Sequence, residues 1–332
     1  MEDFKKLGIK EGFIKGLNEL NIVKPTQVQQ EAIPLLLKGK TDIVAQAQTG
    51  TGKTAAYGLP LLHKIDPKKE AIQGLILCPT RELGQQVAKQ LFRFTKYTDK
   101  IFTEAVYGGA YIEKQIVALR RPTHIVVATP GRLIDLVKRK AIDLQNVKTV
   151  ILDEADEMLS MGFKDDLDFI LDTTNQNRQT LLFSATMSKE VRSISKRFMN
   201  EAQEITVEKL NSGSKNVEHH IYSVSSKDKY ATLKRIADFN PDVYGIVFCR
   251  TRRETQDIAN KFMNDGYNAD AIHGELSQSQ RDVLNQSEVK KLLTSKKLTI
   301  PYKTSVSVGI KNVSGSANNV DSELVRLLKV GS

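Results

Sequence analysis

The chain has 332 residues, of which 40% are hydrophobic and 27% are charged. This composition excludes a wholly disordered or fibrous chain, and the length suffices for about two domains. The formal net charge of +10 favours polyanionic partners. No apolar run reaches the ~18 residues of a membrane span, and the first twelve residues lack the apolar core of a signal peptide. We therefore expect a cytoplasmic protein with no membrane partner, whose two cysteines, Cys78 and Cys249, form no zinc-binding pattern.

The first two thirds of the chain alternate short apolar runs with helical patterns. The predicted strands are residues 42–45, 74–78, 103–107, 124–128, 149–152, 180–183 and 204–207. Helical patterns follow most of them, at residues 52–63, 82–94, 112–119 and 131–139. Strands that are apolar on both faces and alternate with helices predict a parallel sheet covered by helices, which is the α/β class.

A polar segment at residues 211–216 predicts a linker between two domains. A second series then begins, with predicted strands at 218–224, 245–249 and 270–272 and predicted helices at 228–238 and 254–264. The expected division is a first domain at residues 1–210, the linker, and a partial second domain at residues 217–284.

Residues 285–332 form an atypical basic tail, with eight Lys or Arg against three Asp or Glu. Val306, Val308 and Ile310 alternate as in a strand, and residues 324–330 suit a helix. The tail has no catalytic motif, and its composition favours a poorly packed segment.

The most specific motif is AQTGTGKT at residues 47–54, which follows a predicted strand and opens a predicted helix, as in a P-loop. Gly50 and Gly52 let the backbone curl so that N–H groups point at phosphate oxygens. Lys53 supplies a charge for the β- and γ-phosphates, and the Thr54 hydroxyl can bind Mg²⁺. The predicted nucleotide-binding segment is Ala47, Gln48, Thr49, Gly50, Thr51, Gly52, Lys53 and Thr54.

A second motif, VILDEAD at residues 150–156, places carboxylates after an apolar strand. Asp153 can hold Mg²⁺ through water, and Glu154 can orient or deprotonate an attacking water molecule. An acidic run of this kind usually begins a solvated helix. Its place about 100 residues after a P-loop favours a catalytic site made of Lys53, Asp153 and Glu154 instead.

Together these two motifs resemble those of the bacterial DEAD-box ATP-dependent RNA helicases of superfamily 2. Further matches follow in the order of that family. They are PTQVQ at 25–29 (the Q motif), PTREL at 79–83, GG at 108–109, TPGR at 129–132, SAT at 184–186, VFC with Arg-Thr at 247–251, and Gln278-x-x-Arg281. The resemblance covers about residues 4–281.

The resemblance implies a RecA-like P-loop NTPase domain followed by a second, incomplete RecA-like domain. It implies ATP and Mg²⁺, an adenine contact by Gln29, the associated aromatic Phe4, and Ile22 where the family usually stacks an aromatic on the base. Ser184 and Thr186 would couple the two ligand sites by bonding near Asp156. RNA would be held by its backbone, without sequence specificity, through Thr80, Arg81, Gly109, Thr129, Arg132, Gln278 and Arg281. Ribosomes or RNA-degradation complexes are candidate partners.

The sequence also departs from the family. Two later motifs, which usually read much like ATDxAARGxD and HRxGRxGR, have no match in residues 282–332, where Arg326 is the only arginine. Such arginines are worth ~10³ to 10⁵ in rate in comparable NTPases. Two functions therefore remain open: an RNA helicase that hydrolyses ATP, and a nucleotide- and RNA-binding protein with crippled hydrolysis. A DNA translocase sharing the P-loop is disfavoured by the Q motif and by DEAD. The basic runs at residues 138–140 and 196–197 are expected to be solvated helix faces.

Overall fold

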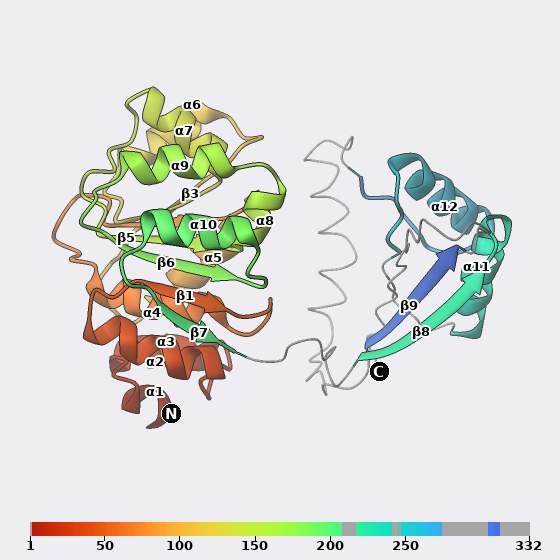
Figure 1. Ribbon diagram of the computed structural model, residues 1–332, viewed down its shortest axis with the longest axis horizontal. Helices are drawn as coiled ribbons and strands as arrows, with labels where there is room; N and C mark the ends of the chain where they lie inside the picture. Colours follow the sequence, from red (N-terminus) through yellow and green to blue (C-terminus); the bar gives the residue numbers. More distant parts are fainter. Residues whose placement is uncertain (1, 208–216, 241–244, 246, 274–304, 313–332) are drawn as a thin grey trace. The chain divides into compact units, whose positions relative to one another are not determined.

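The computed structural model describes residues 2–207, 217–240, 245, 247–273 and 305–312. The chain divides into two compact units, Met1–Glu208 and Lys209–Ser332 (Figure 1). In the part of the chain that is described, no helix is long and apolar enough to cross a membrane.

The first unit is built on a seven-stranded sheet in the order β3-β4-β2-β5-β6-β1-β7 (Figure 1). Its strands are β1 (Ile43–Gln46), β2 (Gly74–Leu77), β3 (Thr103–Val106), β4 (Ile125–Ala128), β5 (Thr149–Asp153), β6 (Gln179–Ser184) and β7 (Gln203–Thr206). Every neighbouring pair is parallel. Each predicted strand is found within one residue at either end, and the parallel α/β class is confirmed.

Helices connect these strands and cover the sheet. They are α1 (Glu2–Lys6), α2 (Glu11–Glu19), α3 (Gln27–Lys38), α4 (Lys53–Lys64), α5 (Arg81–Phe94), α6 (Ile112–Leu119), α7 (Pro130–Lys138), α8 (Ala155–Ser160), α9 (Lys164–Thr173) and α10 (Lys189–Phe198). Side chains of a strand point alternately to its two faces. Ile43 and Ala45 of β1 accordingly join a core with α2–α5, whereas Val44 joins a second core with α7–α10. The apolar runs of the sequence are thus explained by a sheet that is buried on both faces.

The carboxyl ends of the parallel strands meet at one edge of the sheet, where open α/β folds bind their ligands. The P-loop follows β1. The DEAD segment begins at the last residue of β5, and residues 184–186 begin at the last residue of β6. The loops after β2, β3 and β4 carry the PTREL, GG and TPGR segments. The topology therefore brings together motifs that are far apart in the chain, such as the P-loop and residues 184–186, whose nearest members, Thr54 and Ser184, are 130 residues apart.

The second unit contains a parallel strand pair, in which β8 (Val217–Val224) runs beside β9 (Ser305–Asn312). Its helices are η1 (Ser226–Asp228), α11 (Lys229–Phe239) and α12 (Arg252–Asn264). Leu233 and Phe262 form its small core, with Tyr230 and Tyr267 packed edge-on against the Phe262 ring. The strand predicted from the alternation at residues 306–310 is thus found, inside a tail expected to be poorly packed.

Two predicted strands of the second unit are not found where the structure describes them. Residues 245 and 247–249, and residues 270–272, have no regular structure. A strand needs a neighbour for its backbone hydrogen bonds, and the described ladder of this unit joins β8 to β9. The helix predicted at 324–330 and the linker at 211–216 lie outside the described residues.

Candidate nucleotide and nucleic-acid site

The P-loop curls because two glycines adopt the left-handed backbone conformation. Gly50 and Gly52 have φ angles of 84° and 87°, which other residues rarely adopt. A Cβ atom on Gly52 would lie 2.4 Å from the side-chain nitrogen of Gln29, so this position also lacks space. Within the loop, the Thr51 hydroxyl donates to the carbonyl oxygen of Gln48 at 2.7 Å. Gly52 caps the N-terminus of α4, so the curl leads directly into the first helical turn.

Lys53 and Asp153 bring two charged groups into a buried setting beneath this loop. Their exposed fractions are 6% and 2%. The Lys53 Nζ atom and the Asp153 Oδ1 atom are both buried without a hydrogen-bond partner. Burial raises the pKa of Asp153, and the positive charge of Lys53 opposes this rise. Buried polar atoms without partners cost free energy, so this pair is arranged for ligands that supply the missing partners. A phosphate group and a divalent cation fit these two atoms.

Tyr57 is a third member of this buried group, and the sequence analysis did not predict it. Its hydroxyl donates to the Asp153 Oδ2 atom at 2.7 Å. The ring is fully buried and packs edge-on against Phe183 at a centroid distance of 5.1 Å. The available signal was its spacing, because residues four apart on a helix share a face and Tyr57 follows Lys53 by four. Tyr57 thus holds one oxygen of Asp153 and leaves the other unpartnered.

Glu154 links the DEAD segment to the P-loop. It adopts a left-handed conformation with φ 54° at the N-cap of α8. The Thr49 hydroxyl donates to its Oε1 atom at 3.3 Å. A non-glycine residue with this φ is uncommon and strained, which marks the turn between β5 and α8 as specialised. Glu154 is half-buried, so its carboxylate is available at the edge of the site.

The segment after β6 binds the DEAD segment directly. Thr186 donates to the Asp156 Oδ2 atom from its backbone nitrogen at 2.9 Å and from its hydroxyl at 2.8 Å. The Ser184 hydroxyl donates to the Thr186 carbonyl oxygen at 2.6 Å. Burial acts to raise the pKa of Asp156, but the hydrogen bonds that its carboxylate accepts, those from Thr186 above all, outweigh burial and lower that pKa. The residues predicted to couple are thus in contact, while the coupling itself stays a prediction.

Gln29 joins α3 to the P-loop. Its Oε1 atom accepts from the Thr26 backbone nitrogen at 3.0 Å, and its Nε2 atom donates to the Gly52 carbonyl oxygen at 2.9 Å. The first bond forms part of a capping box at the start of α3. A primary amide has two donor hydrogens and an oxygen with two lone pairs. One donor and one acceptor of Gln29 therefore remain, which is the pair an adenine edge requires.

Phe4 and Ile22, the two apolar residues predicted to lie beside the base, are buried and half-buried, respectively. Phe4 is 1% exposed inside the core, so its ring has no free face for a base. Burial therefore argues against a direct adenine contact by Phe4 and favours a role in supporting the core. Ile22 is half-buried and packs against the same core.

The predicted RNA-binding residues lie on the loops after β2, β3 and β4. Thr80 caps α5 by accepting from the Leu83 backbone nitrogen at 3.3 Å. Thr129 accepts from the Gly108 backbone nitrogen at 3.4 Å, which ties two of the loops together, and Gly109 has φ 77°. Arg81 lies over the Tyr107 ring at 4.8 Å. The structure thus groups these residues at one edge.

Arg132, predicted to bind phosphate, also makes hydrogen bonds within the protein, and its contact with RNA stays a prediction. Its Nη1 atom donates to Gln115 Oε1 and its Nη2 atom to the Ala110 carbonyl oxygen, both at 3.0 Å. The guanidinium therefore braces the loop after β3 from within. Gln278 and Arg281, the remaining predicted RNA contacts, lie outside the described residues.

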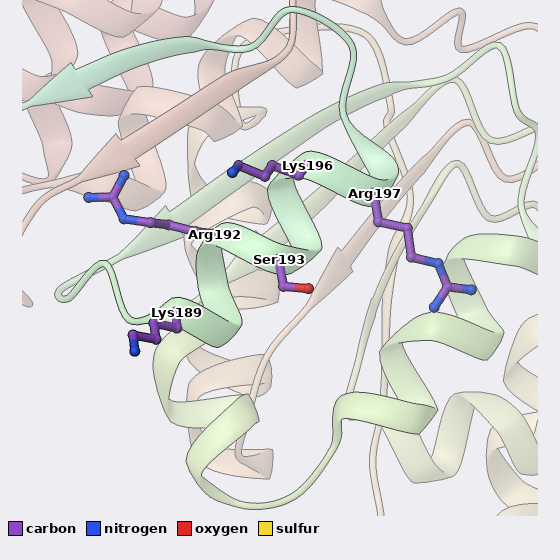
Figure 2. Close-up of a pocket in the computed structure, with 5 residues that line it drawn as sticks. All are labelled: Lys189, Arg192, Ser193, Lys196 and Arg197. Carbon is purple, nitrogen blue, oxygen red and sulfur yellow. The ribbon is translucent and has the colours of Figure 1, made fainter.

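A basic stripe runs along the exposed face of α10 on the first unit. Lys189, Arg192, Ser193, Lys196 and Arg197 line a shallow cavity there (Figure 2). Arg197 is bound to Asp168 at 2.5 Å and to Asp172 at 3.2 Å. The stripe faces solvent, as predicted for residues 196–197, and we assign it no part of the site.

A sequence model of the DEAD/DEAH box helicase family matches residues 26–194 of the chain. The chain is also 44% identical over 281 residues to the DEAD-box ATP-dependent RNA helicase CshA of Bacillus cereus. This alignment covers 85% of the chain and 53% of the relative. The chain thus spans about half the length of that protein.

Two solved structures extend the similarity. A DEAD box protein from the hyperthermophile Methanococcus jannaschii has a TM-score of 0.60 and 37% identity, over 92% of this chain and 80% of that one. Dbp5 of S. cerevisiae, bound to RNA and ADP BeF3, has a TM-score of 0.77 and 26% identity, over 93% and 76%. The family match covers just over half of the 332 residues and includes the P-loop, the DEAD segment and the SAT segment. The chain therefore belongs to the DEAD/DEAH box helicase family.

Proposed function

We propose that the chain acts as an ATP-dependent RNA helicase that hydrolyses ATP to remodel or locally unwind RNA. The observation that carries the proposal is the buried pair of Lys53 Nζ and Asp153 Oδ1, which lack partners beside the curled P-loop. The relative from Bacillus cereus carries this activity in its name, and the S. cerevisiae neighbour was solved with RNA and ADP BeF3.

Each predicted residue has a role that suits its position. Lys53 binds the β- and γ-phosphates, and Gln29 uses its remaining donor and acceptor to select adenine. Thr54 and Asp153 hold Mg²⁺, which when bound neutralises charge on the phosphate oxygens. Glu154 orients the attacking water molecule and accepts its proton.

RNA would lie along the loops after β2, β3 and β4. Thr80, Thr129 and the backbone at Gly109 offer hydrogen bonds to phosphates, and Arg81 adds charge. Such contacts position a strand without reading its sequence. Thr186, through its contact with Asp156, and Ser184, through its bond to Thr186, would connect the nucleotide to this surface. Work in the cytoplasm, alongside ribosomes or RNA-degradation complexes, is consistent with an RNA substrate.

A second candidate function is nucleotide and RNA binding with crippled hydrolysis. It is favoured by the absence of both later arginine-containing motifs from residues 282–332. The two candidates share every binding step and differ in the rate of hydrolysis.

The test measures RNA-stimulated ATP hydrolysis and, separately, nucleotide binding by calorimetry. Glu154→Gln keeps the size and hydrogen bonding of the side chain but removes the base, so binding should survive while hydrolysis falls at least ~10²-fold. Glu157→Gln is the matched control, because Glu157 is exposed on the same segment. Lys53→Ala should weaken nucleotide binding itself. Unchanged binding in Lys53→Ala would contradict the P-loop assignment, and unchanged hydrolysis in Glu154→Gln would move the base elsewhere.

A further inference from the structure

We propose that Tyr111 is a stacking platform for an unpaired base of the RNA, an inference that rests on the proposed function. Tyr111 directly follows the loop that carries Gly108 and Gly109, at the carboxyl edge of the sheet. Tyr111 is 79% exposed, so most of its ring is accessible to a ligand. The motifs predicted to bind RNA at this edge offer groups for phosphates, whereas Tyr111 offers a face for a base.

The loop beneath Tyr111 is fixed by hydrogen bonds from two sides. Arg132 donates to the Ala110 carbonyl oxygen at 3.0 Å, and Gln115 donates to the Tyr107 carbonyl oxygen at 3.1 Å. Gly108 donates to the Thr129 hydroxyl at 3.4 Å. Tyr111 itself is the N-cap of α6, so helix begins immediately after it. The ring is therefore presented from an ordered backbone, which reduces the entropy lost when a ligand binds.

The surroundings of the ring favour a nucleotide over a purely apolar ligand. Lys114 Nζ lies 5.6 Å from the ring centroid, within the range of a cation–π contact. Thr129 and the backbone of Gly108 and Gly109 lie on the same or the adjoining loop. A nucleotide has both a flat π surface for the ring and a phosphate for the lysine. Stacking on an aromatic tolerates any base, because every base has a π face.

The same geometry selects unpaired RNA. Within a duplex the bases are stacked on one another and present only their edges in the grooves. A single tyrosine at the surface of a loop can reach a base face only where the strand is unstacked. Tyr111 therefore gives this edge a preference for single-stranded RNA that phosphate contacts alone do not supply.

The experiment exploits the absence of tryptophan from this chain. Tyr111→Trp introduces a single tryptophan at the proposed platform. Its fluorescence should be quenched by a single-stranded oligouridylate, and much less by an abasic ribose-phosphate oligomer of the same length and charge. In parallel, affinity for fluorescein-labelled oligouridylate is measured by anisotropy at one fixed salt concentration, because phosphate contacts make the affinity depend on salt.

Tyr111→Ser should weaken this affinity about 5- to 150-fold, the range given by loss of one base–aromatic stack, whereas Tyr111→Phe should bind like the parent. Phe92→Ser is the control, since Phe92 is an aromatic of similar exposure, 71%, on α5. Equal affinity of Tyr111→Ser and the parent, or no quenching of Trp at position 111 by bound oligouridylate, would overturn the stacking platform and leave the proposed function intact. A parent chain that fails to bind RNA at all would overturn both.

Discussion

Tyr57 is fully buried, and a phenylalanine at this position would fill the core equally well without burying a hydroxyl group. The Tyr57 hydroxyl has Asp153 Oδ2 as its partner, and burial raises the pKa of Tyr57 well above its ordinary value. The phenol therefore acts as a hydrogen-bond donor and fixes the carboxylate of Asp153. If Asp153 holds Mg²⁺ as proposed, the free oxygen of its carboxylate would be held in place before the cation arrives, which would lower the cost of binding.

Replacing this donor should affect both the fold and the cation. Tyr57→Phe leaves Asp153 Oδ2 buried without its partner, so the free energy of unfolding should fall by about 1–3 kcal/mol in urea titrations. The gain in nucleotide affinity on adding Mg²⁺, measured by calorimetry with and without the metal, should also shrink. Tyr97→Phe is the control, since Tyr97 bonds Glu19 at the exposed surface. An unchanged response to Mg²⁺ in Tyr57→Phe would leave Tyr57 with a purely structural role.

The residues of the site differ in how far the sequence could predict them. Lys53 and Asp153 follow from motifs whose spacing is tied to their chemistry. Tyr57 does not, because in sequence it is one apolar-compatible position of a helix, and its partner is 96 residues away. Arg132 has a different limit: its phosphate contact stays a prediction, and no local pattern predicts its hydrogen bonds to Gln115 and Ala110. Tertiary contacts decide which polar groups form hydrogen bonds within the protein, and no local sequence pattern encodes those contacts.

At the scale of the elements, His63 lies where α4 packs against α2, and its contacts there depend on its protonation. His63 accepts a hydrogen bond from the Lys10 backbone nitrogen at 3.3 Å, and its ring lies 4.8 Å from that of Phe13. Burial, assisted by the positive charge of Lys10, lowers the pKa of His63 to about 4. A proton on this ring would also remove the acceptor that Lys10 uses. The contact is therefore favourable only while His63 is neutral.

This contact should make stability depend on pH. In the unfolded chain His63 has its ordinary pKa of 6.5, so between pH 6.5 and about 4 the unfolded state binds more protons. The stabilisation is therefore fully present above pH 6.5 and is lost as the pH falls toward 4. After allowance for solvent screening, we expect a loss of about 1 kcal/mol between pH 7 and pH 5.

Urea unfolding at pH 7, 6 and 5 measures this loss in the parent chain and in His63→Gln. Glutamine keeps an acceptor for Lys10 but does not titrate, and the carboxylates are common to both chains, so the difference in slope isolates His63. If the free energy of unfolding falls equally with pH in both chains, His63 is not responsible for the loss of stability.

The elements also show where pattern reasoning succeeds and where it fails. The five inner strands of the first unit were predictable because their apolar runs are buried on both faces, as the two cores on either side of β1 demonstrate, whereas the edge strands β3 and β7 are partly exposed. Residues 247–249 have a similarly apolar run, yet the structure gives them no strand. An apolar run predicts that a segment is buried. To form a β-strand, the segment also needs a neighbouring strand with which to pair its backbone hydrogen bonds. β9 supplies that partner to β8 from nearly 90 residues away, a pairing that no spacing rule predicts.

At the scale of the whole chain, the two units carry unequal parts of the proposed chemistry. The P-loop, the DEAD segment and the SAT segment all lie within Met1–Glu208. The family resemblance assigns the arginines that stabilise the transferring phosphate to the second domain. Arg326 is the only arginine in residues 282–332. Binding of nucleotide should therefore depend on the first unit alone, while fast hydrolysis is expected to require the arginine-containing motifs that have no match in residues 282–332.

The proposed helicase activity should accordingly be weak in this chain, with slow RNA-stimulated ATP hydrolysis and little unwinding of a short RNA duplex. Joining residues 1–210 to the complete second domain of a relative should raise both rates by at least ~10³, the lower bound for an arginine finger in comparable NTPases. Nucleotide affinity should change far less, because the groups that bind the phosphates are present in both chains. Arg326→Ala tests the alternative source of charge and should leave the residual rate unchanged. Robust unwinding by the chain itself, abolished in Arg326→Ala, would show that this arginine does the work assigned to the missing motifs.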